Sequence, residues 1–384
     1  MQKTENLHIH FFIFVYNSKY ESILTTMSKQ FIKRSGVLMT SIFLFSLVSF
    51  SQFNNVDFLR TAPVDGVKYL QAYIAPWANA FGAGLNGGWY NTAKPHKFGG
   101  FDITISTSVG IVPTSAQTFD ASKIGLSSSV NGAGISSTVA GPDKAGPSMS
   151  YNANGVTLAT FNAPKGADWR YIPVPTAQVG VGLPFGTELK VRFIPKIKIK
   201  DGDVSLWGVG LLHNLTQYLP GNKLLPFDVS LFAGYTKLMG NVPLGLDPDP
   251  SVAQAYTTVN PSTAFNSQNL NITVSALNVS AIASLNLPVI TFYGGMGYTK
   301  TRTGMELSGN FPLPVAVALP VPHAEYNDSG VKKGSDFPKM DIKNFSGLRA
   351  NIGFRIKLAV ITIHADYTRA QYNVLSTGLG ISFR

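Results

Sequence analysis

The chain contains no cysteine among its 384 residues, so it can form neither disulfides nor thiolate metal sites, and it offers no thiol nucleophile. Charged residues are also scarce, at 13%, against roughly 25% in typical soluble domains. Beyond the N-terminal region there is no uninterrupted apolar run of about 18 residues or more, which argues against a helical membrane protein. The apolar residues must therefore be distributed over shorter elements.

What the chain does contain is a series of segments in which apolar and polar residues alternate, most clearly from Ser346 to Arg384. In 347–358, one face carries Ala350, Ile352, Phe354, Ile356 and Leu358, and the other carries Arg349, Asn351, Gly353, Arg355 and Lys357. We predict an all-β fold, an antiparallel transmembrane β-barrel of roughly 10–14 strands with an N-terminal plug or hatch helix. A soluble β-sandwich or a periplasmic binding protein is the alternative.

The alternation predicts a set of strands in chain order, and two or three more between Ala121 and Ala163. The expected strands are 101–112, 177–185, 186–200, 204–213, 227–238, 270–285, 289–300, 347–358, 360–371 and 372–383. The connections 240–269 and 304–339 are long and rich in Pro, Asn, Ser and Thr. Such connections are typical of the outward-facing loops of an outer-membrane barrel.

An export signal precedes these strands. Residues 1–26 are interpreted as an over-extended start, and 27–51 as a signal peptide with basic residues, an apolar core at Val37–Phe50 and small residues before the cleavage site. A transmembrane anchor is the alternative. Cleavage after Ser51 leaves a surplus of eight positive charges. No basic cluster with stacking aromatics accompanies it, so nucleic acid is not expected as a partner.

Residues 52–98 are predicted to form an N-terminal helical segment, and 99–384 the barrel. Within the former, 64–86 shows apolar residues at helical spacing, with Asp65 as a cap and Pro76 as a site that kinks or splits the helix. The candidate plug residues are Leu70, Ile74, Trp77 and Phe81. A helix lying on the periplasmic rim is the alternative to a plug in the lumen.

The sharpest functional hypothesis concerns polar residues expected to face the lumen. They are Lys190, Arg192, Lys196, Lys198, Arg349, Arg355, Lys357, His364 and Asp366. The basic members would favour anions in the lumen. Alternatively, they only neutralise carboxylates such as Glu188, Asp228 and Asp366.

Sites for catalysis, metals and cofactors are not expected. His364 and Asp366 share a strand face, but a hydrated wall explains them better than a catalytic pair. Asp247 to Pro250 lacks the further acids that a calcium site needs. Gly82 to Gly87 matches a dinucleotide fingerprint only formally, because it follows a helix rather than a strand. We therefore expect no enzyme and no cofactor.

Two blocks of the sequence resemble a known family. The segment from Trp77 to His96, followed by Gly99 to Asp102, and the stretches 207–213 and 224–228 are similar to an uncharacterised family of secreted Bacteroidota proteins. This resemblance implies an outer-membrane barrel and no particular activity. The layout is also similar to the long-chain fatty-acid transporter class, in which an N-terminal hatch lies in the lumen.

The expected function is passive transport of a small or hydrophobic solute across the outer membrane of a Gram-negative bacterium. A surface scaffold or adhesin without transport is the alternative, and a barrel-embedded hydrolase ranks last. The expected partners are outer-membrane lipid and lipopolysaccharide, the barrel-assembly machinery, and a small hydrophobic or anionic solute.

Overall fold

The computed structural model describes residues 63–153, 156–199, 202–221, 225–244, 266–312, 315–317, 323–325, 330–337, 339–342 and 345–383. All of them belong to one structural unit, Val48–Arg384. The expected over-extended start, the signal peptide and the rejected calcium motif at Asp247 to Pro250 lie outside these residues.

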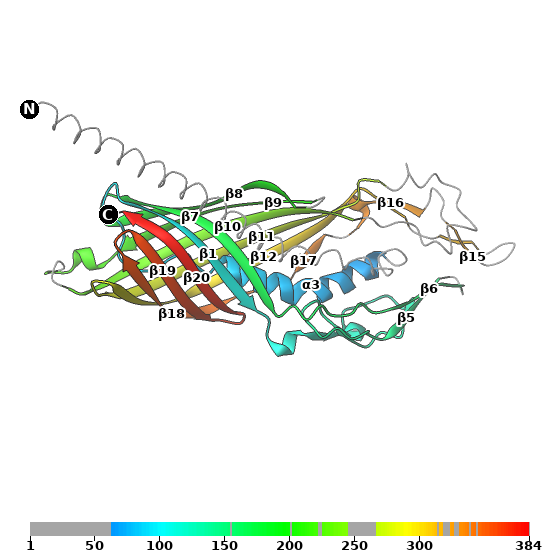
Figure 1. The fold of residues 1–384 in the computed structure, drawn as a ribbon. Helices are drawn as coiled ribbons and strands as arrows, with labels where there is room; N and C mark the ends of the chain where they lie inside the picture. The colour runs from blue at the N-terminus through cyan, green and yellow to red at the C-terminus, as the bar shows by residue number, and fades with distance from the viewer. Residues whose placement is uncertain are drawn as a thin grey trace, which may run out of the picture. The chain divides into compact units, whose positions relative to one another are not determined.

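In the described part of the chain, ten long strands close into an antiparallel barrel (Figure 1). They are β1 (Phe101–Ile111), β7 (Tyr171–Leu183), β8 (Thr187–Ile199), β9 (Gly202–Asn214), β10 (Phe227–Pro243), β11 (Asn269–Asn286), β12 (Ile290–Ser308), β18 (Ser346–Leu358), β19 (Ile361–Arg369) and β20 (Asn373–Phe383). The first and last strands pair from Phe101 opposite Phe383 to Ile111 opposite Asn373. The predicted barrel class is confirmed, and each of the ten expected ranges overlaps one barrel strand.

The extra barrel strands expected between Ala121 and Ala163 are a wrong prediction. Short strands do occur in this range and just before it, but they pair only with one another in two small sheets. These strands are β2 (Thr118–Asp120), β3 (Val130–Asn131), β4 (Ile135–Ser137), β5 (Ser148–Ala153) and β6 (Val156–Asn162). A local hairpin and a barrel hairpin have the same residue alternation, so the pattern alone could not separate them.

The two ends of the barrel differ. We call the end where Phe101 pairs with Phe383 the closing end; there the connections 184–186, 287–289 and 359–360 are short. At the opposite loop end, 112–170, 244–268 and 309–345 are long connections. The loop end also carries β13 (Asn310–Pro312), β14 (Val315–Val317), β15 (His323–Glu325), β16 (Val331–Lys333) and β17 (Met340–Ile342), of which β17 pairs with the outer part of β12.

Strand length also varies around the ring. Strands β10, β11 and β12 have 17, 18 and 19 residues, whereas β1 and β20 have 11 each. At the closing end β12 and β18 pair with Ile290 opposite Ile356, whereas β12 continues past its last pair with β18, Lys300 opposite Ser346, as far as Ser308. The longer strands therefore extend the wall at the loop end.

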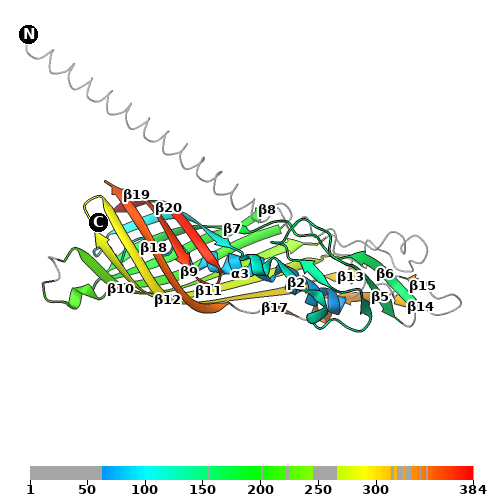
Figure 2. The ribbon, with the colours of Figure 1, turned by 90° about the horizontal axis from the view of Figure 1, so that it is seen from below.

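In the described part of the chain, one α-helix precedes the barrel, α3 (Pro63–Leu85), and it continues through Pro76 without a break. Most of its side chains are buried. Figures 1 and 2 show α3 with its N-terminal end beside the loop-end strands β5 and β6 and its C-terminal end among the barrel strands. Among the described residues, no helix has the length and hydropathy that crossing a membrane would require.

Candidate functional site: the occupied barrel interior

The C-terminal end of α3 lies between two arginines from opposite walls. Arg192 on β8 donates from Nη1 to the Leu85 carbonyl at 2.8 Å and from Nη2 to the Gly87 carbonyl at 2.7 Å. Arg349 on β18 donates to the Asn86 carbonyl at 2.6 Å. Strands β8 and β18 lie five places apart in either direction around the ring. The helix end is therefore held from both sides of the barrel.

The chemistry of a helix end explains why arginine suits this place. The last carbonyls of a helix have no partner within it and carry the negative end of the helix dipole. Arg192 and Arg349 are only 0% and 5% exposed, and a buried charge is costly unless it is hydrogen-bonded. The carbonyls and the guanidinium groups thus satisfy each other. The Arg192 guanidinium also stacks 3.7 Å from the ring centre of Trp89.

Amide side chains of the wall add to this grip on the chain after α3. Gln178 on β7 donates to the Trp89 carbonyl at 3.2 Å and accepts a hydrogen bond from Arg192 at 3.1 Å. Asn278 on β11 donates to the Asn86 carbonyl at 3.3 Å. Residues 85–89 thereby receive hydrogen bonds from four strands.

From this point toward the closing end, an apolar cluster occupies the lumen. Its residues are Trp89, Tyr90, Ala93, Leu212, Phe232, Ile282 and Tyr293. Trp89 packs against Phe232 with a centroid distance of 5.5 Å. Methyl groups at Gly210 or Gly234 would meet the Trp89 ring at 3.0 Å, so the missing side chains make room for it. The Tyr90 hydroxyl donates to Asn351 at 2.7 Å, which satisfies its polar tip.

At the closing end, His96 ties the same segment to a charged cluster. Its backbone N–H donates to Glu188 Oε2 at 2.9 Å, and its Nδ1 and Nε2 lie 3.0 Å from Glu188 Oε2 and Ser382 Oγ. The Lys190 ammonium contacts the other oxygen of Glu188. Asp102 Oδ1 lies 3.7 Å from His96 Nδ1. The segment between α3 and β1 is therefore held along the whole height of the lumen.

This cluster has the donor set of a metal site. His96, Asp102 and Glu188 each place one possible ligand atom within 4.8 Å of the others. The ammonium of Lys190, however, already contacts Glu188 and supplies a positive charge there. A divalent cation would have to approach this ammonium, so an ion-pair network explains the cluster better than a metal site.

Most of the residues predicted to face the lumen lie on the inner wall. Lys190, Arg192, Arg349, Arg355, His364 and Asp366 are buried there, and Lys357 is half-buried. Arg355 donates to Asn91 at 3.3 Å and Lys357 to the Ser382 carbonyl at 3.3 Å. Most of these contacts are to the N-terminal segment or to the wall itself.

The prediction that Lys196 and Lys198 face the lumen is wrong. Pairing of β8 with β9 shifts between Ile194 and Ile197, and Lys198 then lies opposite Asp203 on the outer face. Lys196 is 69% exposed and forms an ion pair with Asp203 at 3.1 Å. A bulge adds one residue to the strand, and a shift by one residue moves every following side chain to the opposite face of the strand. The signal was Pro195, because proline inside a sheet is largely confined to edges and bulges.

His364 and Asp366 share the inner face of β19 but do not act on each other. Asp366 accepts a hydrogen bond from Tyr293 at 3.2 Å, and His364 Nδ1 lies 3.5 Å from the Asn91 amide nitrogen. Among the described residues, no hydrogen bond joins the pair and no serine hydroxyl bonds to the His364 ring. The arrangement lacks the geometry of a catalytic triad.

The candidate plug residues are all buried. Leu70, Ile74, Trp77 and Phe81 are each less than 5% exposed, and Trp77 stacks on Phe81 at 5.2 Å. Sequence reasoning did not single out His96, Gln178, Asn278 or the pair Trp89 and Tyr90 as site residues. Trp89, Tyr90 and His96 lie in the block from Trp77 to His96 that resembles a known family. That resemblance was the signal in the sequence that could have pointed to them.

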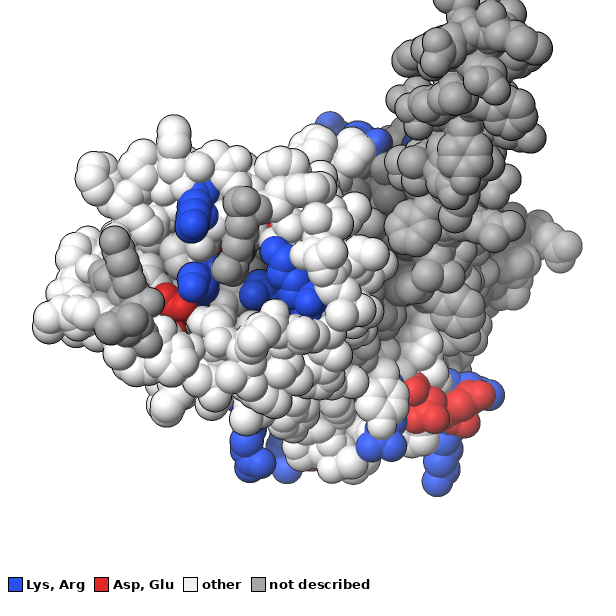
Figure 3. Space-filling view, turned by 60° about the vertical axis from the view of Figure 1, so that its left-hand side comes forward, with Lys and Arg blue, Asp and Glu red and all other residues white. Residues whose placement is uncertain are grey.

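The mouth at the closing end is basic. Lys94 and Lys97 are exposed and Lys357 is half-buried, all on elements that end there. Figure 3 shows Lys and Arg side chains gathered in a hollowed face at this end. Such a mouth attracts anions at moderate ionic strength.

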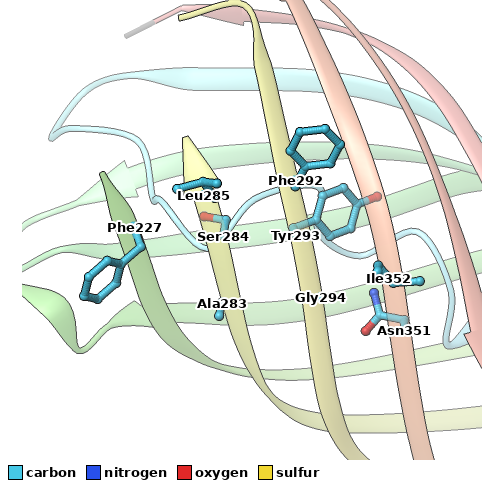
Figure 4. Close-up of a pocket in the computed structure, with 9 residues that line it drawn as sticks. All are labelled: Phe227, Ala283, Ser284, Leu285, Phe292, Tyr293, Gly294, Asn351 and Ile352. Carbon is cyan, nitrogen blue, oxygen red and sulfur yellow. The ribbon is translucent and has the colours of Figure 1, made fainter. Parts of the chain in front are cut away.

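A separate groove of about 440 Å³ lies on the outer wall (Figure 4). Its lining residues are Phe227, Ala283, Ser284, Leu285, Phe292, Tyr293, Gly294, Asn351 and Ile352. The outward residues Ala283 and Gly294 are small, whereas their neighbours Leu285 and Phe292 are large and exposed. The groove is therefore a dent in the apolar outer surface, with room for hydrocarbon chains rather than polar ligands.

The chain matches a family of unknown function, DUF6588, over residues 28–383 and belongs to it. No curated protein matches it. Solved structures with related barrels include the translocator domain of the autotransporter NalP from Neisseria meningitidis, at 10% identity and a TM-score of 0.29, covering 75% of this chain and 89% of that one.

Two further structures have similar scores. The outer-membrane protease OmpT from Escherichia coli has 8% identity and a TM-score of 0.29, covering 74% of this chain and 97% of that one. A Pseudomonas aeruginosa FadL homologue has 10% identity and a TM-score of 0.22, covering 77% and 94%. Likenesses at this level carry no argument about function. The fold is established by strand pairing, and it resembles the barrels of Gram-negative outer-membrane proteins.

Proposed function

We propose that the protein is a Gram-negative outer-membrane barrel that is closed by its own N-terminal segment and serves as a non-transporting surface scaffold for its long loops. The observation that carries this proposal is the grip of Arg192 and Arg349 on the end of α3 from opposite walls. A segment held from two sides in the middle of the lumen leaves a solute no straight path through the described interior.

The energy of this arrangement supports a permanent closure. Each buried hydrogen bond contributes about 0.5–1.5 kcal/mol, and more where a charged group takes part. Moving the segment would break the bonds to residues 85–96 together, and Arg192 and Arg349 would keep only their wall partners, Gln178 and Thr368. The proposed role does not use His364 and Asp366 as a catalytic pair, because the two side chains bind different partners.

Passive transport of a small or hydrophobic solute is the second candidate. The basic mouth at the closing end favours it, since such a mouth would concentrate small anions. Transport would require the N-terminal segment to move as a hatch. In either case we propose outer-membrane lipid, lipopolysaccharide and the barrel-assembly machinery as partners.

Liposome swelling and bilayer conductance with purified full-length protein test the proposal. We expect no flux of neutral or anionic small solutes through the wild-type protein. A double variant, Arg192→Ala with Arg349→Ala, loosens the segment, and Lys196→Ala is the matched control on the outer wall. Flux through the wild-type protein would overturn the scaffold role and favour transport.

A further inference from the structure

The N-terminal half of α3 is built into the loop end of the barrel. Asp65 accepts a hydrogen bond from the Ser127 backbone at 2.8 Å, and Gln71 donates to the Asp341 carbonyl at 2.5 Å. The Tyr73 carbonyl accepts from the Val139 N–H at 3.0 Å. Ser127 and Val139 belong to the connection 112–170, and Asp341 belongs to β17. The start of the helix therefore lies among the long loops.

The chain then descends through the barrel. A methyl at Gly110, near the loop end of β1, would overlap the Ala80 carbonyl. Further along, Asn86 contacts Asn278 in the middle of β11, and His96 contacts Glu188 near the closing end. Gly99 N–H finally donates to the Gly182 carbonyl at 3.2 Å, just before β1 begins. The order of these contacts follows the barrel from one end to the other.

We infer that the segment from Pro63 to Gly100 crosses the barrel, so that Pro63 lies on the opposite side of the membrane from Phe101. Long loops of outer-membrane barrels face outward and short turns face the periplasm. Pro63, the first described residue, then lies on the outer side of the membrane beside the long loops. This orientation rests on the proposed outer-membrane location.

The absence of native cysteine permits a direct test. Val64→Cys and Phe98→Cys introduce thiols at side chains that are 53% and 77% exposed, at the two ends of the crossing segment. Whole cells are treated with a maleimide attached to a polymer too large to pass through porins. We expect Val64→Cys to react in intact cells, and Phe98→Cys to react only after the outer membrane is permeabilised.

Two matched controls define the sides of the membrane. Ser128→Cys lies in the exposed connection 112–170 at the loop end, and Phe185→Cys lies in the exposed β7–β8 turn at the closing end. The inference requires Val64→Cys to behave as Ser128→Cys does and Phe98→Cys as Phe185→Cys does. If Val64→Cys instead follows Phe185→Cys, the crossing is overturned.

The outcomes also separate this inference from the proposed function. Reaction of all four variants in intact cells would contradict the outer-membrane location. Flux through the wild-type protein with the expected labelling pattern would contradict the closed scaffold and leave the crossing intact. Folding of each variant is checked by its heat-dependent gel mobility, which should match that of the wild type because all four substitutions are at exposed side chains.

Discussion

At the scale of single residues, Arg192 links the barrel wall to the helix end more extensively than any of the other predicted lumen residues. It bonds to two carbonyls and to Gln178, and it covers Trp89. Its planar donors fit two carbonyls at once, which a lysine ammonium cannot reproduce. Arg349 shares the Asn86 carbonyl with Asn278, so its loss leaves that acceptor partly satisfied.

We therefore expect Arg192→Ala to destabilise the folded barrel by about 1–3 kcal/mol for each of the two carbonyls that it leaves unpaired. Arg349→Ala should cost less, and Arg192→Lys should fall between the alanine variant and the wild type. The midpoint of heat-dependent gel mobility in detergent measures this order. Lys196→Ala, on the exposed outer face, should not shift the midpoint, and equal losses for all three sites would contradict the argument.

Two tyrosines predict a response to alkaline pH at the loop end. Burial raises the pKa of Tyr69 and that of Tyr73 to about 12, against about 10 in an unfolded chain. A raised pKa in the folded state means that folding favours the neutral phenol. This contribution to stability is complete below pH about 10 and is lost as pH rises toward about 12.

Limited proteolysis of the loop end between pH about 8 and 12 tests this expectation. Cleavage in the connection 112–170 should increase above pH about 10 in the wild type. The double variant Tyr69→Phe with Tyr73→Phe keeps both rings but cannot ionise, so it should show a smaller increase. An identical pH profile for both proteins would show that other groups cause the opening.

At the scale of elements, the alternation of residues predicted all ten barrel strands because each strand has an apolar outer and a polar inner face. It did not predict the face of Lys196 and Lys198, because a bulge depends on pairing with β9 and leaves no period in the sequence. It also could not tell that β5 and β6 pair locally. The hydrogen bonds from Arg192 to the end of α3 join residues about a hundred positions apart in the sequence. A local residue pattern cannot predict such a contact.

The close approach of α3 to β1 gives a prediction at the scale of elements. A methyl group at Gly110 would overlap the carbonyl of Ala80, so Gly110→Ala should displace the helix and lower the thermal midpoint. Gly240→Ala is the matched control, since a methyl there meets only the Asp203 carbonyl at 3.7 Å. Faster proteolysis between Leu85 and Phe98 in the first variant alone would report the displacement.

At the scale of the whole molecule, closure depends on the pairing of β1 with β20. Thr107 and Thr377 lie directly opposite each other across this seam, at a distance that facing residues of antiparallel strands share and that suits a disulfide. We expect Thr107→Cys with Thr377→Cys to form an intramolecular disulfide on oxidation and to resist heat-dependent unfolding. Thr107→Cys with Leu277→Cys, which places the second thiol on β11, should not form one.

The unequal wall has a consequence for how the protein would stand in the outer membrane that we propose as its location. A tilted strand needs about 9–11 residues to cross the hydrocarbon core, which β1 and β20 match, whereas β11 and β12 have 18 and 19 residues. At roughly 3.3 Å per residue along a tilted strand, the additional residues of β11 and β12 extend one side of the barrel wall by on the order of 20 Å at the loop end. A large molecule that approaches the loop end would therefore meet the side formed by β11 and β12 before it meets the side formed by β1 and β20.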